Sequence, residues 1–227
     1  MTRTARFGIG GGVLALLGLA SALLLTRADV PLPLGFSSIR AAPHFQDPAL
    51  LARAFALPVA ATFPRPLLSQ TNPSSCGPTS AANVLRSEGA TTTPDEVAGH
   101  GTGCLGGFCF GGLTLSQLAQ ATRATSPGWK VTELHPETLA AFREELGHAN
   151  DPARRLIINF HRRPLFGSGG GHHAPIGGYL EAEDLVLVLD VNERFGPWLV
   201  SSARLFEAMD TVDSSSGQKR GLLVLTR

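Results

Sequence analysis

Charged residues are scarce in this chain, and neither sign dominates. Only 16% of the 227 residues are charged, and the formal net charge is +1. No segment combines a basic stripe with interleaved aromatic residues, the pattern that predicts nucleic-acid binding. We therefore expect no nucleic-acid partner. The length fits one domain of average size, large enough to bury a hydrophobic core.

Cysteine is also scarce, with residues only at positions 76, 104 and 109. Cys104 and Cys109 form a close pair in a glycine-rich stretch. The pair fits a disulfide in an oxidising compartment, two free thiols, or half of a metal site. No second pair completes a four-ligand set, so no metal site is predicted. Cys76 is left as the odd thiol and is the candidate for reactivity.

The N-terminal segment has the pattern of an export signal or a membrane anchor. Arg3 and Arg6 precede an uncharged, apolar run over 7–25, which is long enough to span a bilayer. We expect 1–28 to be a signal peptide or an anchor in the inner membrane. The protein would then be exported and periplasmic, or face the periplasm. A proline-rich linker is expected over 29–43, followed by a catalytic domain over 44–227.

Helical patterns come first in the chain and strand patterns later. Helical spacing predicts helices over 47–57, 78–87, from Thr93 onward, 114–125 and 136–146. The seven glycines in 99–112 argue against regular structure there. Apolar runs predict strands over 155–160, 172–180, 184–191, 198–200 and 221–226. This order predicts an α+β fold, with a helical N-terminal half and an antiparallel sheet in the C-terminal half.

Cys76 is the predicted nucleophile. It directly precedes a predicted helix, whose N-terminus supplies partial positive charge, and a later imidazolium can supply more. A Cys at a helix start, then a His, then an Asp is the chain order of a papain-like cysteine site. The alternative is an inert thiol that packs as a small apolar side chain.

His172 and Asp190 are the predicted partners of the thiol. They are centred on position 181, near an expected turn over 181–183, and their even separation places both side chains on one face of a hairpin. Asp190 would then orient the ring of His172, the general base. Asp190 could instead cap the next turn. His173 would point to the opposite face, so only one of the two histidines can serve.

Gln70 is the predicted oxyanion donor. It lies six residues before Cys76. Its side-chain amide could bind a developing oxyanion together with the backbone N–H of Cys76.

Four motifs together resemble phytochelatin synthase over roughly residues 34–227. They are QTNPSSCG at 70–77, GHHAPIGGY at 171–179, LDV at 189–191 and EAMDTVDSSSGQKRG at 207–221. The resemblance implies a papain-like fold and a triad of Cys76, His172 and Asp190, with Gln70 at the oxyanion. It selects His172 over His173.

The resemblance also implies glutathione as the substrate. The family's Cys releases glycine and holds a γ-glutamylcysteinyl thioester, which passes to a second glutathione or to water, so the protein is expected to be an acyltransferase. No cofactor is required, and Cd or Zn would enter only as glutathione-thiolate complexes, in metal detoxification. Arg194 and Arg220 are the candidates for binding the substrate carboxylate, and Arg220 fits better. The Cys-rich C-terminal region of plant members is not present in this sequence, which implies a short, prokaryotic (bacterial) type that mostly hydrolyses.

Two other functions fit parts of the sequence. Ser74 and Ser75 precede the Cys, and Pro78 and Thr79 follow Cys-Gly, a pattern similar to bacterial papain-like processing peptidases. A papain-like peptidase acting on another peptide is therefore one alternative. A non-catalytic, exported protein that binds metal through thiols is the other, although three cysteines are few for that role.

Overall fold

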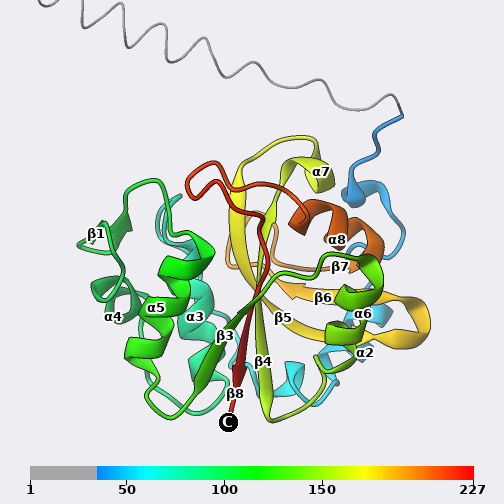
Figure 1. The fold of residues 1–227 in the computed structure, drawn as a ribbon. Coiled ribbons are helices and arrows are strands. Elements are labelled where there is room, and N and C mark those ends of the chain that lie inside the picture. The colour runs from blue at the N-terminus through cyan, green and yellow to red at the C-terminus, as the bar shows by residue number, and fades with distance from the viewer. Residues whose placement is uncertain (1–34) are drawn as a thin grey trace, which may run out of the picture. The chain divides into compact units, whose positions relative to one another are not determined.

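A six-stranded antiparallel sheet organises the fold. The computed structural model describes residues 35–227. Within them the large sheet has the strand order β3-β8-β4-β5-β6-β7, and all neighbouring strands run antiparallel. Strands β1 and β2 form a separate two-stranded sheet. Figure 1 shows the large sheet with helices packed around it. The predicted α+β fold with an antiparallel sheet is confirmed.

The helices concentrate early in the described chain and the strands of the large sheet late. The helices are α2 (Pro48–Phe55), α3 (Cys76–Arg86), α4 (Pro94–Gly99), α5 (Leu115–Thr125), α6 (Leu139–Gly147), α7 (Arg163–Phe166) and α8 (Ser202–Met209). The strands are β1 (Cys104–Leu105), β2 (Phe108–Cys109), β3 (Lys130–Leu134), β4 (Arg154–His161), β5 (Gly171–Leu180), β6 (Leu185–Leu189), β7 (Pro197–Ser201) and β8 (Leu222–Thr226).

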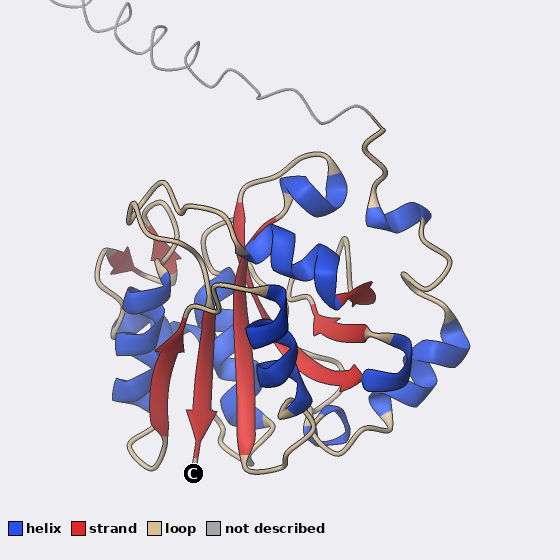
Figure 2. Ribbon diagram, turned by 45° about the vertical axis from the view of Figure 1, so that its right-hand side comes forward, coloured by secondary structure: helices blue, strands red, loops and turns tan. Residues whose placement is uncertain are grey.

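Helices cover both faces of the large sheet (Figure 2). One hydrophobic cluster packs helices α2 to α5 against the face that carries Ile157 and Leu223. A second cluster packs helices α6 to α8 against the face that carries Ile158 and Val224. Successive residues of a strand point to opposite faces, so neighbours such as Ile157 and Ile158 belong to different clusters. Side chains of adjacent strand residues therefore enter two separate packed environments.

The helix starts follow the local signals in the sequence. Thr93 and Thr114 each close a capping box, with Glu96 and Gln117 respectively. Helix α2 is capped by the Asp47 carboxylate. Helix α3 differs from the prediction because it begins at Cys76, two residues before the expected start. This shift places the predicted nucleophile in the first turn.

Several elements differ from the sequence prediction. The glycine-rich stretch is not wholly irregular, because β1 and β2 pair there across a turn at Gly106 and Gly107, both with positive φ. Strand β3 was not predicted because it lies at the sheet edge and alternates poorly, with only Val131 buried. Helix α8 was missed although Ser202, Leu205 and Met209 are buried at helical spacing.

The β5–β6 hairpin differs in register from the prediction, and a bulge corrects the difference. Its last pair is Leu180 with Leu185, so the hairpin is not centred on residue 181. A regular ladder from that pair would place residues 172 and 190 on opposite faces. The register shifts between Ile176 and Gly178, which inserts one extra residue in β5. That bulge returns residues 172 and 190 to the same face.

The compact part of the described chain begins at Ser37, ahead of the boundary expected at residue 44. Ile39, within the expected linker, is buried in the hydrophobic cluster of α6 to α8. Among residues 35–227, no helix has the length and hydrophobicity needed to span a bilayer. The signal or anchor expected over 1–28 lies outside the described residues.

Gly177→Ala should destabilise the hairpin. A Cβ at Gly177 would lie 2.9 Å from Leu187 Cδ2 and 3.0 Å from Leu189 Cγ. Both contacts are in the packed core, so we expect a loss of about 1–3 kcal/mol in the free energy of unfolding. Gly128→Ala is the matched control, because no atom lies within 4 Å of its added Cβ. Urea denaturation measures both, and equal stabilities would contradict the role of Gly177.

Candidate active site

Cys76 is the first residue of helix α3 and is nearly buried. Its exposed fraction is 6%. The helix N-terminus directs partial positive charge at the thiol. A Cβ added at Gly77 would make ordinary van der Waals contacts, 3.4 Å from Leu118 Cδ1 and 3.6 Å from the Nδ1 of His173. The first turn of α3 thus packs closely beside His173 of strand β5.

Two imidazoles, His172 and His173, interact with this thiol. The Nδ1 of His173 lies 4.0 Å from the Cys76 Sγ. Burial alone would raise the pKa of the Cys76 thiol, but hydrogen bonds from His172 and then His173 hold that pKa well below its ordinary value. The lowered pKa agrees with the predicted partnership of Cys76 with His172. The expectation that His173 faces away from the thiol is wrong.

Both histidines can interact with one thiol because the sheet opens beside them. The pairing of β5 with β6 ends at Ile176 and Val188, so residues 171–175 have no partner on that side. Helix α3 packs on β5, with Cys76 and Ser80 from its first half both contacting His173 at this edge. A group at a strand edge can contact side chains from both faces. His172 and His173 do point to opposite faces of the sheet, as alternation predicts. Cys76 lies at the strand edge, however, and so is not confined to one face.

Asp190 holds the ring of His172. The Nε2 of His172 lies 2.9 Å from the Asp190 Oδ1, which leaves Nδ1 to face the thiol. Burial opposes a charged imidazole, but hydrogen bonds with Asp190 and Cys76 outweigh it and raise the pKa of His172. A lowered thiol pKa together with a raised imidazole pKa favours a thiolate–imidazolium pair at neutral pH.

The Asp190 carboxylate is fully enclosed by donors. The Nη2 of Arg162 lies 2.9 Å from each carboxylate oxygen. Trp198 Nε1 donates to Oδ2 at 3.1 Å, and the Asn192 backbone N–H donates to Oδ1 at 2.9 Å. Burial would raise the pKa of Asp190, but the hydrogen bond with His172 and the neighbouring charges lower it to about 2. Asp190 thus stays ionised, and the side chain is not a simple turn cap.

His173 has its own partner on the other face of the sheet. The Asn159 Nδ2 lies 2.9 Å from the His173 Nε2. The Asn159 Oδ1 accepts from the Arg220 Nη1 at 2.7 Å, and this guanidinium also contacts the Asp213 carboxylate at 3.2 Å. Asn159 was not among the predicted site residues. A polar residue within the apolar run 156–160 is nevertheless a sequence signal for a buried functional group.

A polar cavity that is partly open to solvent lies beside this network. It is lined by charged and hydroxyl side chains, among them Thr114, Ser116, His135, Asp213, Lys219 and Arg220. Arg220 is therefore placed where it can contact a bound ligand, whereas Arg194 does not line the cavity and lies in an exposed turn after β6. Of the two candidate arginines, the structure brings only Arg220 to this cavity.

Gln70 lies in the loop that leads to α3. Its backbone N–H donates to the Val191 carbonyl at 2.8 Å, which ties the loop to the residue after Asp190. Its side-chain Nε2 donates to the Asn72 carbonyl at 2.9 Å. That amide nitrogen has a second hydrogen, so the oxyanion role of Gln70 stays a prediction.

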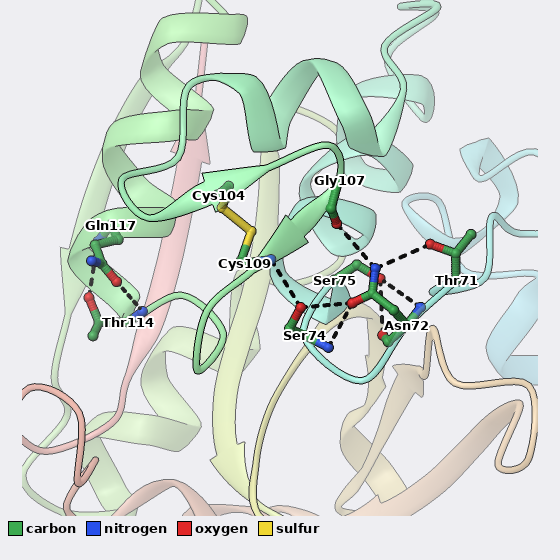
Figure 3. The surroundings of a disulfide bond; sticks show 9 residues. All are labelled: Thr71, Asn72, Ser74, Ser75, Cys104, Gly107, Cys109, Thr114 and Gln117. Atoms are coloured by element: carbon green, nitrogen blue, oxygen red, sulfur yellow. Dashed lines mark hydrogen bonds between the residues drawn. A yellow bond between two sulfur atoms is a disulfide. The ribbon is translucent and has the colours of Figure 1, made fainter. Parts of the chain in front are cut away.

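The β1–β2 hairpin supports the loop before Cys76 (Figure 3). A disulfide joins Cys104 and Cys109, which selects the first of the three alternatives for this pair. The Cys109 backbone N–H donates to the Ser74 hydroxyl at 3.0 Å, and Asn72 Nδ2 donates to the Gly107 carbonyl at 3.1 Å. Among residues 35–227, no cluster of three or more His, Cys, Asp or Glu side chains forms a metal site.

A family model places this arrangement among known proteins. Residues 109–222 match the model for phytochelatin synthase. The chain belongs to the phytochelatin synthase family. The matched segment contains His172, Asp190 and Arg220. It begins after Gln70 and Cys76, which therefore lie outside the match. The fold brings Cys76 next to this matched segment, where it contacts His173.

Curated proteins similar to this chain are named glutathione gamma-glutamylcysteinyltransferase. A glutathione gamma-glutamylcysteinyltransferase 3 from Lotus japonicus is 31% identical over 118 residues, or 51% of this chain and 25% of the relative. A glutathione gamma-glutamylcysteinyltransferase 2 from Arabidopsis thaliana is 40% identical over 73 residues, or 32% of this chain and 16% of the relative. The match thus spans about a quarter of the relatives' length or less.

Solved structures with a similar fold include peptidase domains. The peptidase domain of Streptococcus ComA, a bi-functional ABC transporter, aligns with 70% of this chain and 96% of its own at 16% identity, with a TM-score of 0.48. A double glycine motif protease from an AMS/PCAT transporter aligns with 71% of this chain and 91% of its own at 13% identity, with a TM-score of 0.48. With identities of 16% or less and TM-scores of 0.48, these similarities say nothing about the function of this chain.

The lowered thiol pKa predicts fast alkylation of Cys76 at mildly acidic pH. A lowered pKa means that the thiolate persists as the pH falls below the ordinary range near 8.5. Iodoacetamide should therefore modify the folded protein much faster than the unfolded protein at about pH 6.5. Cys76 is the only cysteine outside the disulfide, so mass spectrometry reports it directly. A folded-state rate that rises only near pH 8.5 would contradict the ion pair.

Proposed function

We propose that this protein transfers the γ-glutamylcysteinyl group of glutathione through a thioester on Cys76, with water or a second glutathione as the acceptor. The observation that carries the proposal is the thiol of Cys76 at a helix N-terminus, with a lowered pKa, beside the strand on which Asp190 holds the ring of His172. Membership of the phytochelatin synthase family supports the substrate. The names of the curated relatives support the reaction.

The proposed acylation uses the groups around the thiol. The Cys76 sulfur attacks the cysteinyl carbonyl carbon of glutathione, and the carbonyl oxygen becomes an oxyanion. The Cys76 backbone N–H and the Gln70 amide donate to that oxygen. The His172 imidazolium then gives its proton to the leaving glycine nitrogen as the C–N bond breaks. The product is a thioester on Cys76, and His172 is left neutral.

Deacylation reverses these proton movements. His172 takes a proton from a water molecule or from the amine of a second glutathione as that nucleophile attacks the thioester carbon. The Cys76 sulfur leaves as a thiolate, and the ion pair with His172 is restored. Water gives γ-glutamylcysteine, and glutathione gives a chain one unit longer.

The polar cavity suits the γ-glutamyl end of the substrate. That end carries an α-carboxylate and an α-ammonium group, so it needs both charges in its site. Arg220 and Lys219 offer cations, and Asp213 offers an anion, in one cavity lined partly by Asn159. We propose Arg220 as the carboxylate ligand because a guanidinium binds carboxylates in a fixed geometry.

We further propose that the protein is exported and acts in metal detoxification. The apolar run over 7–25 supports export, directly or as an inner-membrane anchor. The Cys104–Cys109 disulfide agrees with an oxidising compartment. Cd²⁺ or Zn²⁺ would enter as glutathione-thiolate complexes, and thus as part of the substrate.

Cys76→Ser tests the proposed function. The hydroxyl lacks an accessible anion at neutral pH, so release of glycine from glutathione should become undetectable. Wild-type protein incubated with glutathione and quenched in acid should carry a γ-glutamylcysteinyl mass on Cys76. The matched control is Cys104→Ser with Cys109→Ser, which removes two sulfurs but keeps the nucleophile and should still form the adduct.

Two results would contradict the proposal. Glycine release by Cys76→Ser at the wild-type rate would remove the nucleophile from the reaction. Cleavage of ordinary α-linked peptides through Cys76, with no turnover of glutathione, would instead favour a papain-like peptidase.

Hydrolysis should dominate over transfer. Water is present at about 55 M against millimolar glutathione, and only tight positioning of the acceptor overcomes that ratio. We therefore expect γ-glutamylcysteine as the main product, with a minor phytochelatin fraction that rises with glutathione and Cd²⁺. Product analysis by mass spectrometry over a range of glutathione concentrations measures the ratio. Dominant long oligomers at about 1 mM glutathione would show that the acceptor is held well.

A further inference from the structure

The thiol of Cys76 lies between two similar half-sites on opposite faces of β5. In the β4–β5 ladder, His172 pairs with Phe160 and His173 pairs with Asn159. His172 uses its Nε2 for the Asp190 carboxylate. His173 uses its Nε2 for the Asn159 amide. Each ring therefore has its Nδ1 available on the side of the thiol.

The orientation of the Asn159 amide determines where His173 carries its proton. The Arg220 guanidinium only donates, so the Asn159 atom that lies 2.7 Å from Arg220 Nη1 must be the oxygen. The Asn159 Nδ2 is then the group that donates to the His173 Nε2 at 2.9 Å. A nitrogen that accepts this bond holds no proton, so the ring proton of His173 lies on Nδ1.

The backbone holds this ring in place. The Ser80 hydroxyl of helix α3 donates to the His173 carbonyl at 3.0 Å, which links the strand to the helix that carries Cys76. Asp213 contacts the Arg220 guanidinium at 3.2 Å and restrains the far end of the network. These contacts orient the ring of His173, whose Nδ1 lies 4.0 Å from the Cys76 Sγ.

We propose that His173 is a second catalytic histidine, which donates a hydrogen bond from Nδ1–H to the Cys76 thiolate while His172 carries the proton to the leaving group. The two rings have different tasks because their partners differ. A carboxylate accepts from a ring nitrogen and favours a second proton on His172. An amide N–H donates to a ring nitrogen and leaves His173 a single proton, directed at sulfur. The inference rests on the thiolate nucleophile of the proposed function.

Removing this donor should have a partial effect. The charged or polar groups that act on the thiol are His172, His173, Arg162 and Arg220. Three of them remain when His173 is changed, together with the N-terminus of α3. A hydrogen bond to a charged group typically changes an equilibrium by about tenfold or somewhat more. We expect a loss of that size in thiolate reactivity and not its abolition.

Two substitutions separate the donor from the space that the ring fills. His173→Phe keeps a planar ring and removes the donor. His173→Asn places an amide nitrogen close to the former Nδ1 and can restore the bond. Alkylation by iodoacetamide at about pH 6 should slow about tenfold in His173→Phe and recover most of that loss in His173→Asn. Above the ordinary thiol pKa, the rates should converge with that of the wild type.

Further measurements control for indirect effects. His100→Gln, at an exposed position beyond α4, should match the wild type at every pH. The acid limb of kcat/KM for glycine release should move to higher pH in His173→Phe and return in His173→Asn. Alkylation requires no glutathione, so a shifted alkylation profile without glycine release would support the inference while refuting the proposed substrate.

Two outcomes would overturn the inference. One is an alkylation profile in His173→Phe that equals that of the wild type. The other comes from nitrogen-15 NMR of the unaltered protein, which reports the ring tautomer of His173 directly. A proton on Nε2 would contradict the proposed hydrogen bond even if His173→Phe failed to fold.

Discussion

A buried thiol that must ionise is the constraint on which this structure depends. Burial alone raises the pKa of the Cys76 thiol, so the surroundings must supply more than enough positive charge and hydrogen bonding to reverse that effect. The N-terminus of α3 and the rings of His172 and His173 do so. Each ring then needs a buried partner of its own, which explains why Asp190 and Asn159 lie within the packed core of the sheet.

The departure of β5 from regular pairing makes this arrangement possible. The bulge near Gly177 brings Asp190 to the face of His172, and the end of the β5–β6 ladder exposes the strand edge to Cys76. Both irregularities occur next to the site, where bulges commonly redirect side chains. The two glycines at 177 and 178 fit them, because a Cβ at either position would approach within 3.0 Å of a neighbouring atom.

The same hydrogen-bonding network connects the nucleophile to the polar cavity. Arg220 and Asp213 line the cavity, and Arg220 also holds the oxygen of Asn159, whose nitrogen donates to His173. A carboxylate bound to Arg220 would therefore lie three hydrogen bonds away from the ring that faces the Cys76 thiol. In the proposed function, substrate binding and the state of the Cys76 thiol would share residues, which would explain why the sequence motif around Arg220 accompanies the motifs around Cys76 and His172.

The sequence by itself determined the elements whose signals are local. Capping residues located the starts of α4 and α5, and apolar runs located β4 to β6. The chain order of Cys76, His172 and Asp190 indicated a cysteine nucleophile with a His–Asp pair. These features need only neighbouring residues or a short hairpin, and so they can be found without the fold.

Tertiary structure decided which groups surround the thiol. Asn159 and Arg162 lie at the end of β4 and Trp198 lies in β7, and only the folded chain brings them to Asp190 and to the two histidines. The role of His173 depended on where the ladder between β5 and β6 ends, because alternation fixes the face of a side chain but not what approaches the strand edge. Long-range packing, which no local pattern encodes, brings α3 to that edge and places both histidines at Cys76.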